Sequence, residues 1–263
     1  MRYFLLLTIL LSACATTRSQ PKNSVERFYL DPTGKTYFLL ADDRLATDNP
    51  LGQNRFEFFD SSLGSPDVID VANPFSVMLF YADYGQLVIL DRTLSERSRL
   101  DLFSVEDILE PSTVARASDN KVWVFDNWDY RLKLLESSGK VSQRSNDLRL
   151  EIRAVAPPDA IYVNRGQVLL HYMADNRLAL FTNYGRFERW VEFPKADDFS
   201  WNPPYLLGRS EDAFWVWDAV TNKRRNQPRP QVQGGRKEQW IPMAEGYFRM
   251  DPVSLKKELV KFN

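Results

Sequence analysis

The sequence predicts an all-β fold, a β-propeller with six blades. Two observations lead to this prediction. Short pairs of apolar strands recur along the chain at intervals of about 40–50 residues, which is the spacing typical of propeller blades. Aromatic residues make up 13% of the chain, with seven Trp, and such residues suit tightly packed sheets because aromatic pairs add to the energy of burial.

The repeated unit is clearest in residues 120–140. The run Val122–Phe125 consists of β-branched and aromatic residues, and Leu132–Leu135 provides a second apolar segment. Residues of these types favour a packed, pleated surface. Asn127, Asp129 and the pair Ser138-Gly139 supply turns around the second segment. Two strands alone are marginally stable in water, so the unit needs further copies to bury its faces.

Weaker copies occur on both sides of this unit. They cover residues 36–64, 76–95, 167–185, 213–223 and 246–262. If Tyr37, Met78, Val122, Val168, Phe214 and Tyr247 mark equivalent places, the intervals are 41, 44, 46, 46 and 33 residues. The fifth copy keeps its first strand without a clear second one. These copies together account for six blades.

The remaining strands are expected between these hairpins. Inner strands are predicted at 67–72, 112–118, 160–166 and 204–210, and outer strands at 98–102, 142–148 and 187–193. Phe103–Glu110 has the composition of a short helical insertion, with Ser104 as its cap. Pro, Gly and basic residues in 222–239 predict a long exposed loop. We expect the last strand, near Val253–Phe262, to pair with Val25–Leu30 and close the ring.

The first residues form a secretory leader. Arg2 precedes an apolar run too short to span a bilayer, and the run ends in Leu11-Ser12-Ala13-Cys14. This tetrapeptide resembles the lipobox of bacterial lipoproteins, which implies a diacylated Cys14 at the mature N-terminus. Ala15 after the cysteine favours the outer membrane. The predicted organisation is a signal peptide (1–13), a lipidated cysteine with its tether (14–24) and a propeller domain (25–263), with the protein anchored by lipid at the periplasmic face of the outer membrane.

Composition argues against several kinds of chemistry. The chain has 34 basic and 35 acidic residues, so no global field favours nucleic acid. Cys14 is the only cysteine and His171 the only histidine, and no metal-binding or phosphate-binding motif is present. The strand-end carboxylates are interpreted as turn caps: Asp60, Asp91, Asp126, Glu136, Asp175 and Asp218. We therefore expect no catalytic residue, no metal and no cofactor.

Aromatic and basic side chains near strand ends are the candidates for a binding surface. Trp, Tyr and Arg dominate interface hot spots, and loops on rigid scaffolds often carry binding function. The candidates are Tyr84, Trp128, Tyr130, Tyr184, Trp201, Tyr205, Arg224 and Arg225. The alternative is that the rings simply fill the spaces between blades.

The unit at 120–140 resembles the blade of six-bladed propellers of the NHL type. Residues 73–96 and 117–135 are also similar to uncharacterised propeller-like lipoproteins of Bacteroidota. This resemblance implies an envelope location and a non-catalytic role. The predicted function is an interaction scaffold within an envelope protein complex, as an accessory of outer-membrane protein assembly or secretion. The alternative is a glycan- or small-ligand-binding propeller, or a degenerate glycan-cleaving enzyme, that uses its central cavity, with these side chains converging at its mouth: Asp83, Tyr84, Asp129, Tyr130, Asp175 and Tyr184.

Overall fold

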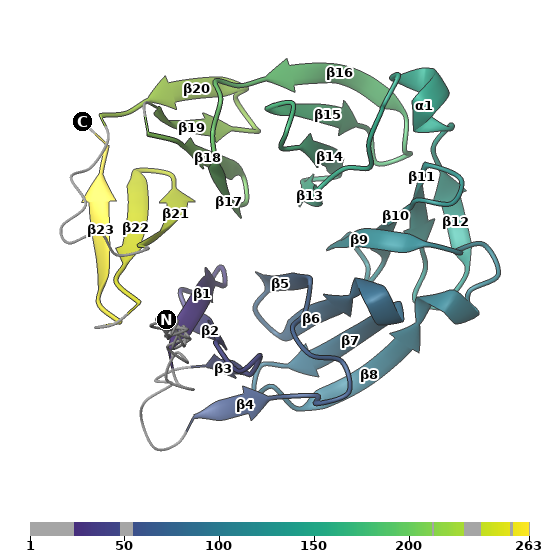
Figure 1. The fold of residues 1–263 in the computed structure, drawn as a ribbon, viewed down its shortest axis with the longest axis horizontal. Coiled ribbons are helices and arrows are strands. Elements are labelled where there is room, and N and C mark those ends of the chain that lie inside the picture. Colours follow the sequence, from purple (N-terminus) through teal and green to yellow (C-terminus); the bar gives the residue numbers. More distant parts are fainter. Residues whose placement is uncertain (1–23, 48–54, 212, 229–237, 253–254, 263) are drawn as a thin grey trace, which may run out of the picture.

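The computed structural model confirms the predicted fold class, because six antiparallel sheets form a ring (Figure 1). It describes residues 24–47, 55–211, 213–228, 238–252 and 255–262. The predicted leader, Cys14 and nearly all of the tether lie outside the described residues. Within the described part of the chain, no helix has the length and apolar character needed to cross a membrane.

Each blade is a meander of consecutive antiparallel strands. Blade one consists of β1 (Val25–Leu30), β2 (Thr36–Leu40), β3 (Leu45–Thr47) and β4 (Phe56–Phe58). Blade two consists of β5 (Val68–Asn73), β6 (Ser76–Tyr81), β7 (Gln86–Asp91) and β8 (Glu96–Asp101). Blade three consists of β9 (Pro111–Arg116), β10 (Val122–Asp126), β11 (Arg131–Leu135) and β12 (Val141–Arg144). Blade four consists of β13 (Ala160–Asn164), β14 (Gln167–Tyr172), β15 (Arg177–Phe181) and β16 (Phe187–Glu192). Blade five consists of β17 (Asp198–Asn202), β18 (Tyr205–Arg209), β19 (Phe214–Asp218) and β20 (Lys223–Asn226). Blade six consists of β21 (Gln239–Met243), β22 (Gly246–Met250) and β23 (Lys257–Lys261). The first strand of each blade lies nearest the central axis (Figure 1).

The middle strands are apolar on both faces because each sheet packs between two neighbours. In β10, all five residues from Val122 to Asp126 are buried. Trp123 and Phe125 pack toward blade four, whereas Val122 and Val124 pack toward blade two. Each of the six junctions between neighbouring blades contains one such cluster of buried residues. The outer strands face solvent, and β20 is exposed along its whole length.

Aromatic rings fill the junctions on either side of blade five. Between blades four and five, Phe193 stacks on Trp215 with 4.7 Å between ring centroids. Between blades five and six, Phe214 meets Trp240 edge-to-face at 5.1 Å. Offset stacks and edge-to-face pairs are the arrangements that the ring quadrupoles favour. The abundance of aromatic residues in the sequence is therefore explained largely by packing between blades.

Blade five differs from the predicted register. The repeat spacing predicts that Phe214 is equivalent to Val122 and Val168, but Phe214 lies on β19, the third strand of its blade. The equivalent second strand is β18, within the segment predicted as an inner strand, and the actual inner strand β17 was missed. Gly208 lies inside β18 and pairs with Trp215 of β19. A Cβ there would lie 2.2 Å from the indole of Trp215, so the packed Trp requires a glycine, a residue that is depleted in strands.

Two further predictions need correction. Residues 222–239 do not form a loop throughout, since β20 begins at Lys223 and pairs with β19, and β21 begins at Gln239; residues 229–237 lie outside the described residues. Phe103–Glu110 contains one short 3-10 turn, Leu102–Ser104, capped by Asp101 rather than Ser104. The described α-helix, α1 (Leu148–Glu151), follows blade three and was not predicted.

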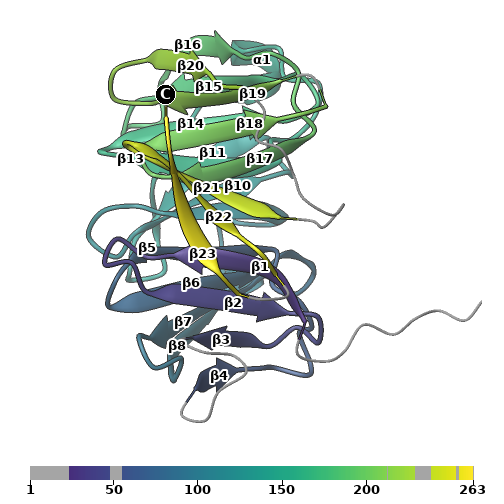
Figure 2. The ribbon, with the colours of Figure 1, turned by 90° about the vertical axis from the view of Figure 1, so that its left-hand side faces the viewer.

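The ring closes by packing and not by a shared sheet. The predicted pairing of the last strand with Val25–Leu30 is wrong, because β23 pairs with β22 and β1 pairs with β2. Blades six and one lie side by side (Figure 2) and share a cluster that includes Phe28, Leu40 and Ile241. The amide of Gln239 adds two bonds: its Oε1 accepts from Phe28 N at 2.6 Å, and its Nε2 donates to Glu26 O at 2.5 Å. One side chain thus satisfies two backbone groups that a neighbouring strand would otherwise have paired.

Candidate functional site

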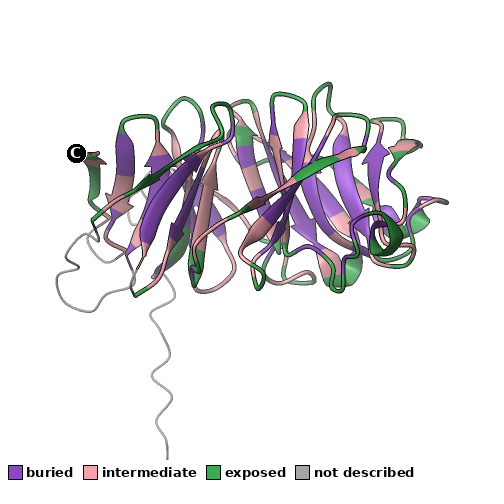
Figure 3. Cartoon of the chain, turned by 90° about the horizontal axis from the view of Figure 1, so that it is seen from above, coloured by how far each residue is buried: buried purple, intermediate pink, exposed green. Residues whose placement is uncertain are grey.

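The turns of the propeller lie on two opposite faces (Figure 3). We call one the N-terminal face, because β1 begins there at Val25. The antiparallel meander places on it the turns between second and third strands and the segments that join one blade to the next. The opposite face carries the turns between first and second strands and between third and fourth strands. Residues from different blades can therefore be assigned to one face or the other.

Exposed large apolar side chains are concentrated on the N-terminal face. Among the described residues, seven of the twelve exposed large apolar side chains lie there: Phe59, Tyr84, Phe103, Leu109, Trp128, Leu150 and Val155. Four of them belong to blades two and three, and we call this group the apolar patch: Tyr84, Phe103, Leu109 and Trp128. Trp128 is 66% exposed. Exposed apolar groups gathered in one region mark interaction surfaces more often than single exposed residues do.

Backbone geometry holds the members of the apolar patch in place. Tyr84 ends the short 3-10 turn Ala82–Tyr84, and the following Gly85 has a φ of 59°. A Cβ at Gly85 would lie 2.7 Å from the ring of Phe103, so Phe103 lies directly against this glycine. The carboxylate of Asp126 joins the other two members, because it accepts from Leu109 N at 3.0 Å and from Trp128 N at 3.1 Å.

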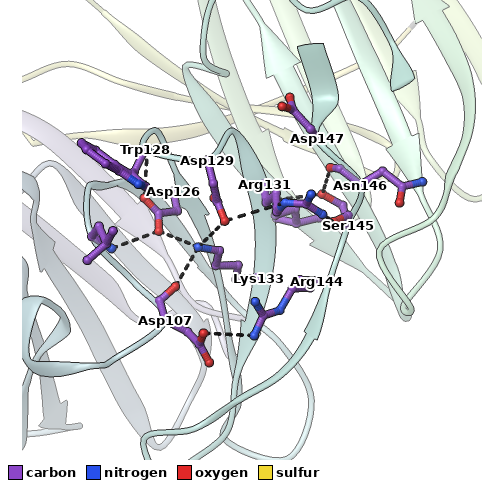
Figure 4. A network of polar contacts seen from close by, with 12 residues as sticks. Asp107, Asp126, Trp128, Asp129, Arg131, Lys133, Arg144, Ser145, Asn146 and Asp147 are labelled. Atoms are coloured by element: carbon purple, nitrogen blue, oxygen red, sulfur yellow. Dashed lines mark hydrogen bonds and ion pairs between the residues drawn. The ribbon is translucent and has the colours of Figure 1, made fainter. Parts of the chain in front are cut away.

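A buried ion pair lies beneath the apolar patch (Figure 4). Asp126 and Lys133 are both buried, and Lys133 Nζ lies 2.7 Å from Asp126 Oδ2. The same ammonium lies 2.8 Å from Asp129 Oδ2 and donates to the backbone carbonyl of Asp107 at 2.7 Å. It therefore has three acceptors from different segments, which matches its three donor hydrogens. The turn of blade three and the segment arriving from blade two are tied together at this point.

The charge on Asp126 is well compensated. Burial raises the pKa of this carboxyl group, but the hydrogen bond from Lys133 and the N–H groups of Leu109, Glu110 and Trp128 outweigh it, so the pKa falls below its ordinary value. Hydrogen bonds to the charged form are the physical cause of such a net decrease. Asp126 is thus a structural anion that positions the apolar patch, and its chemistry matches the turn-cap role predicted for it.

The local charge of the two faces differs even though the total is balanced. Every turn between a second and a third strand carries a carboxylate: Asp42, Asp43, Asp83, Asp129, Asp175, Glu211 and Asp251. The described turns of the opposite face carry both signs, with basic residues in excess: the basic residues are Lys35, Arg55, Arg92, Lys121, Lys140, Arg165 and Arg186, and the acidic ones are Asp31, Asp119, Glu136 and Glu245. Two of the carboxylates on the N-terminal face, Asp83 and Asp129, lie in the turns that carry Tyr84 and Trp128, and Asp129 is paired with Lys133. Carboxylates on the face that carries the apolar patch favour a partner with basic residues around an apolar centre.

The predicted surface residues are distributed over several regions. Tyr84 and Trp128 lie in the apolar patch. Tyr130 lies nearby with a φ of 58°, but its half-buried ring packs edge-to-face on Phe125 at 5.5 Å. Burial raises the pKa of Tyr130. This ring is therefore partly a packing element, as the alternative interpretation of the aromatic residues predicted.

The other predicted residues lie away from the apolar patch. Tyr184 is exposed in the turn between β15 and β16, on the opposite face from Tyr84 and Tyr130. The structure thus does not bring these three tyrosines together at one mouth. Trp201 stacks on Tyr162 at 4.8 Å between blades four and five, and Tyr205 packs in the junction with blade six. Arg224 and Arg225 are exposed on β20, where the guanidinium of Arg225 lies 5.8 Å from the ring centroid of Phe262.

His171 is fully buried between blades four and five. Its Nδ1 lies 3.2 Å from the hydroxyl of Tyr162, and its ring meets Phe199 edge-to-face at 4.5 Å. Burial lowers its pKa to about 3. This is the packed histidine expected from the sequence. Among the described residues, no group of three or more His, Cys, Asp or Glu side chains is arranged to hold a metal ion.

Several strand-end carboxylates are turn caps, as predicted. Asp60 accepts from Ser62 N at 3.0 Å, Asp91 from Thr93 N at 2.7 Å, and Asp218 from Val220 N at 2.8 Å. Glu136 and Asp175 differ, because each pairs with a basic side chain. Glu136 pairs with Lys121, which lies in the neighbouring turn before β10, and Asp175 pairs with Arg177 at the start of β15.

Sequence reasoning missed Phe103 and Leu109. Both lie in the segment between blades two and three, which was predicted to be a helical insertion of no stated role. Two large apolar residues among Glu106, Asp107 and Glu110 were the available signal, since apolar groups in an acidic surface segment need a partner or an explanation. The meander topology places this segment and the turn that carries Trp128 on the same face, and this shared position would have grouped Phe103 and Leu109 with Trp128.

Comparison with known proteins supports the fold and leaves the family open. No protein-family model matches the sequence, and no curated protein is detectably similar. A solved streptogramin B lyase structure is similar, with a TM-score of 0.57 and 12% identity over 93% of this chain and 85% of that one. Catalytically inactive virginiamycin B lyase from Staphylococcus aureus, crystallised with quinupristin, has a TM-score of 0.55 and 11% identity over 91% of this chain and 85% of that one. The designed protein Ika8 has a TM-score of 0.50 and 12% identity over 92% of this chain and 76% of that one. At such low identity these similarities show the fold alone: the chain is a six-bladed β-propeller.

Proposed function

We propose that the protein is a lipid-anchored, non-catalytic scaffold of the outer membrane that docks a protein partner on the apolar patch of blades two and three. The observation that carries the proposal is the set of four exposed apolar residues, Tyr84, Phe103, Leu109 and Trp128, held on one face of a rigid ring. Interfaces of this kind centre on a few aromatic anchors surrounded by polar groups. The carboxylates in the turns of this face suit a basic partner surface.

The rigidity of the patch supports a binding role. Asp126 holds the backbone at Leu109 and Trp128, and Lys133 holds Asp126. A surface that is already ordered before association loses less conformational entropy when the partner binds. Apolar side chains on flexible loops would lose more conformational entropy on binding.

The position of the chain start gives the proposal an orientation. The tetrapeptide ending in Cys14 supports a lipid anchor, and the chain enters β1 at Val25 on the N-terminal face. A short tether leaving this face would keep the apolar patch near the membrane. The partner would then be another envelope protein at the membrane surface, in the context of outer-membrane protein assembly or secretion.

Crosslinking in intact envelopes, followed by purification and mass spectrometry, tests the proposal. We expect stoichiometric recovery of envelope proteins with the wild-type chain. Trp128→Ala should weaken the complex by about 30-fold, which corresponds to the roughly 2 kcal/mol typical of a hot-spot residue. Loss of the complex with retained thermal stability supports docking on the patch.

Phe75→Ala is the matched control. Phe75 is an equally exposed aromatic residue, 68% exposed, in the turn between β5 and β6 on the opposite face. Its removal should leave the complex intact. Equal loss with both variants, or none with either, would contradict docking on the apolar patch, and recovery of the chain alone would remove the scaffold proposal.

A further inference from the structure

A second surface feature, on the rim of the ring, goes beyond the proposed function. A hollow of about 410 Å³ lies where blade three meets blade four, lined by residues 143–146 and by the turn residues 184–186. This volume falls within the range of small-ligand sites, about 300–1,000 Å³. The hollow is formed by the end of β12 and the turn between β15 and β16, and none of its lining residues belongs to the apolar patch. Arg144 links it to the segment that carries Phe103 and Leu109, because its guanidinium pairs with Asp107 (Figure 4).

The floor of the hollow is a close contact between two backbones. Gly185 is buried and has a φ of 71°. A Cβ at this position would lie 3.4 Å from Ser145 N, an ordinary contact distance, so the two backbones lie close together and it is the turn that favours glycine here. The left-handed backbone at this position suits glycine, which has no Cβ penalty there.

Hydrogen bonds fix both walls. On the blade four side, Thr182 Oγ1 accepts from Tyr184 N at 3.2 Å and from Arg186 N at 3.3 Å, and Gly185 N donates to Thr182 O at 3.0 Å. On the blade three side, Ser145 N donates to Leu132 O at 2.8 Å, and Arg131 Nη1 donates to Ser145 O at 2.6 Å. The hollow is therefore formed before any ligand arrives.

These same bonds restrict the chemistry of a ligand. The backbone N–H groups of Tyr184, Gly185, Arg186 and Ser145 are all used within the protein. They are therefore not available to cradle a phosphate or to pair with an added peptide strand, which are the two usual roles of free backbone donors. Recognition in the hollow must come from side chains.

The side chains combine a cationic group, amides and an aromatic ring. Arg186 is exposed and has no ion pair among the described residues, and Arg144 shares its guanidinium with Asp107 at 3.1 Å, where both side chains are about half exposed. No carboxylate lines the hollow, whereas Gln143 and Asn146 bring two amides. Asn146 Nδ2 already donates to Glu151 Oε1 at 3.3 Å, and Gln143 Oε1 is buried without a hydrogen-bond partner, so a ligand would meet Asn146 Oδ1 and Gln143 Nε2. Tyr184 is 64% exposed and offers an open ring face. Guanidinium groups bind carboxylates in a planar, two-bonded geometry, amides bond hydroxyl groups, and an exposed ring can cover the apolar C–H face of a pyranose.

We propose that this hollow binds a carboxylate-bearing saccharide, with the carboxylate on Arg186, sugar hydroxyls on the two amides and the pyranose ring on Tyr184. The ligand class is acidic glycan, bound at the rim and not in the centre of the ring.

Titration calorimetry with the purified chain tests this assignment, with trigalacturonic acid as the probe. Maltotriose, which has hydroxyl groups and no carboxylate, and acetate, which has the carboxylate alone, separate the two contributions. We expect measurable binding of trigalacturonic acid and at least tenfold weaker binding of either comparison ligand. Comparable binding of acetate would overturn the saccharide assignment, and absence of binding to trigalacturonic acid would overturn the site.

Variants locate the binding. Arg186→Gln and Tyr184→Ala should each weaken binding by about tenfold or more, the usual effect of losing roughly one charge-assisted hydrogen bond or one ring contact. Arg92→Gln is the matched control, because Arg92 is an exposed residue of the corresponding turn in blade two and lies outside the hollow. Both affected side chains are exposed, so the thermal stability should not change. Retained binding in Arg186→Gln and Tyr184→Ala, or equal weakening in Arg92→Gln, would place the ligand elsewhere and refute the proposal.

Discussion

Lys133→Met removes the cation from the buried pair beneath the apolar patch and leaves Asp126 buried. Methionine keeps the length and apolar stem of lysine, so the change isolates the charge. Removing one partner of a buried ion pair usually costs about 3–5 kcal/mol. Asp126 keeps three backbone N–H donors, from Leu109, Glu110 and Trp128. We therefore expect a loss near the lower end, about 3 kcal/mol.

The assay is thermal and urea unfolding followed by tryptophan fluorescence and circular dichroism. For a chain of this size, 1 kcal/mol shifts the Tm by about 2–4 °C, so the Tm should fall by roughly 6–12 °C. Lys121→Met is the matched control in the same sheet. Lys121 Nζ lies 3.0 Å from Glu136 Oε1, with side chains 29% and 28% exposed, and such surface pairs contribute about 0–1 kcal/mol.

The pH dependence gives a second signature. The pKa of Asp126 is lowered in the folded protein, so its contribution is present above the unfolded value, about 3.9, and is lost as the pH falls through the folded value. Loss of the hydrogen bond from Lys133 should raise this pKa, because that bond is one of the causes that lower it. The stability gap between wild type and Lys133→Met should then narrow below about pH 4. Equal unfolding of Lys133→Met and Lys121→Met, or a gap that widens in acid, would refute this account of the pair.

Three further predictions follow from ring closure, the buried histidine and the leader. Gln239→Leu removes the two bonds that the Gln239 side chain makes to blade one and should cost about 1–3 kcal/mol in urea unfolding. Gln167→Leu, which loses one exposed bond to Glu188, should cost less than about 1 kcal/mol, and equal costs would contradict closure by Gln239. Burial lowers the pKa of His171 to about 3, so as the pH falls the unfolded chain takes up a proton at this residue before the folded chain does. The free energy of unfolding should therefore fall between about pH 6.5 and pH 3, by up to about 1.4 kcal/mol per pH unit. His171→Leu should reduce this slope, and an unchanged slope would assign the acid sensitivity to other groups. Cys14→Ser should release the protein from membranes and abolish metabolic fatty-acid labelling, and persistent labelling would refute the lipobox assignment.

The hairpins of the fold were predictable because their cause is local. In β10 and β11, alternating β-branched, aromatic and leucine residues favour strands, and Asn127 and Asp129 favour the turn between them. The same chemistry recurs in blades two and four, where both strands of each copy are found. The outer strands β8, β12 and β16 were also placed correctly, to within a few residues, because few other segments were left for them.

Errors arose where packing overrode the local signal. Gly208 weakens the strand signal of β18, yet the indole of Trp215 requires it. The exposed strand β20, Lys223–Asn226, has the composition of a basic loop, but it pairs with β19 through backbone groups that composition does not reveal. Closure by Gln239 depends on a contact across more than 200 residues of chain, for which a single sequence holds no signal.

The candidate sites show the same division between local and distant causes. Asp126 was interpreted as a turn cap, and its bond to Trp128 N, two residues away, is of that kind. Its bonds to Leu109 N and Glu110 N join residues that are 17 and 16 positions apart in the sequence, and they depend on the path of the segment that connects blade two to blade three. Only these two longer-range bonds bring Leu109 to the same carboxylate as Trp128, so that the exposed tryptophan becomes part of the apolar patch. A carboxylate that caps a turn of the repeat can therefore also position a binding surface. Whether it does so depends on which backbone groups, distant in the sequence, the fold places within hydrogen-bond distance of it.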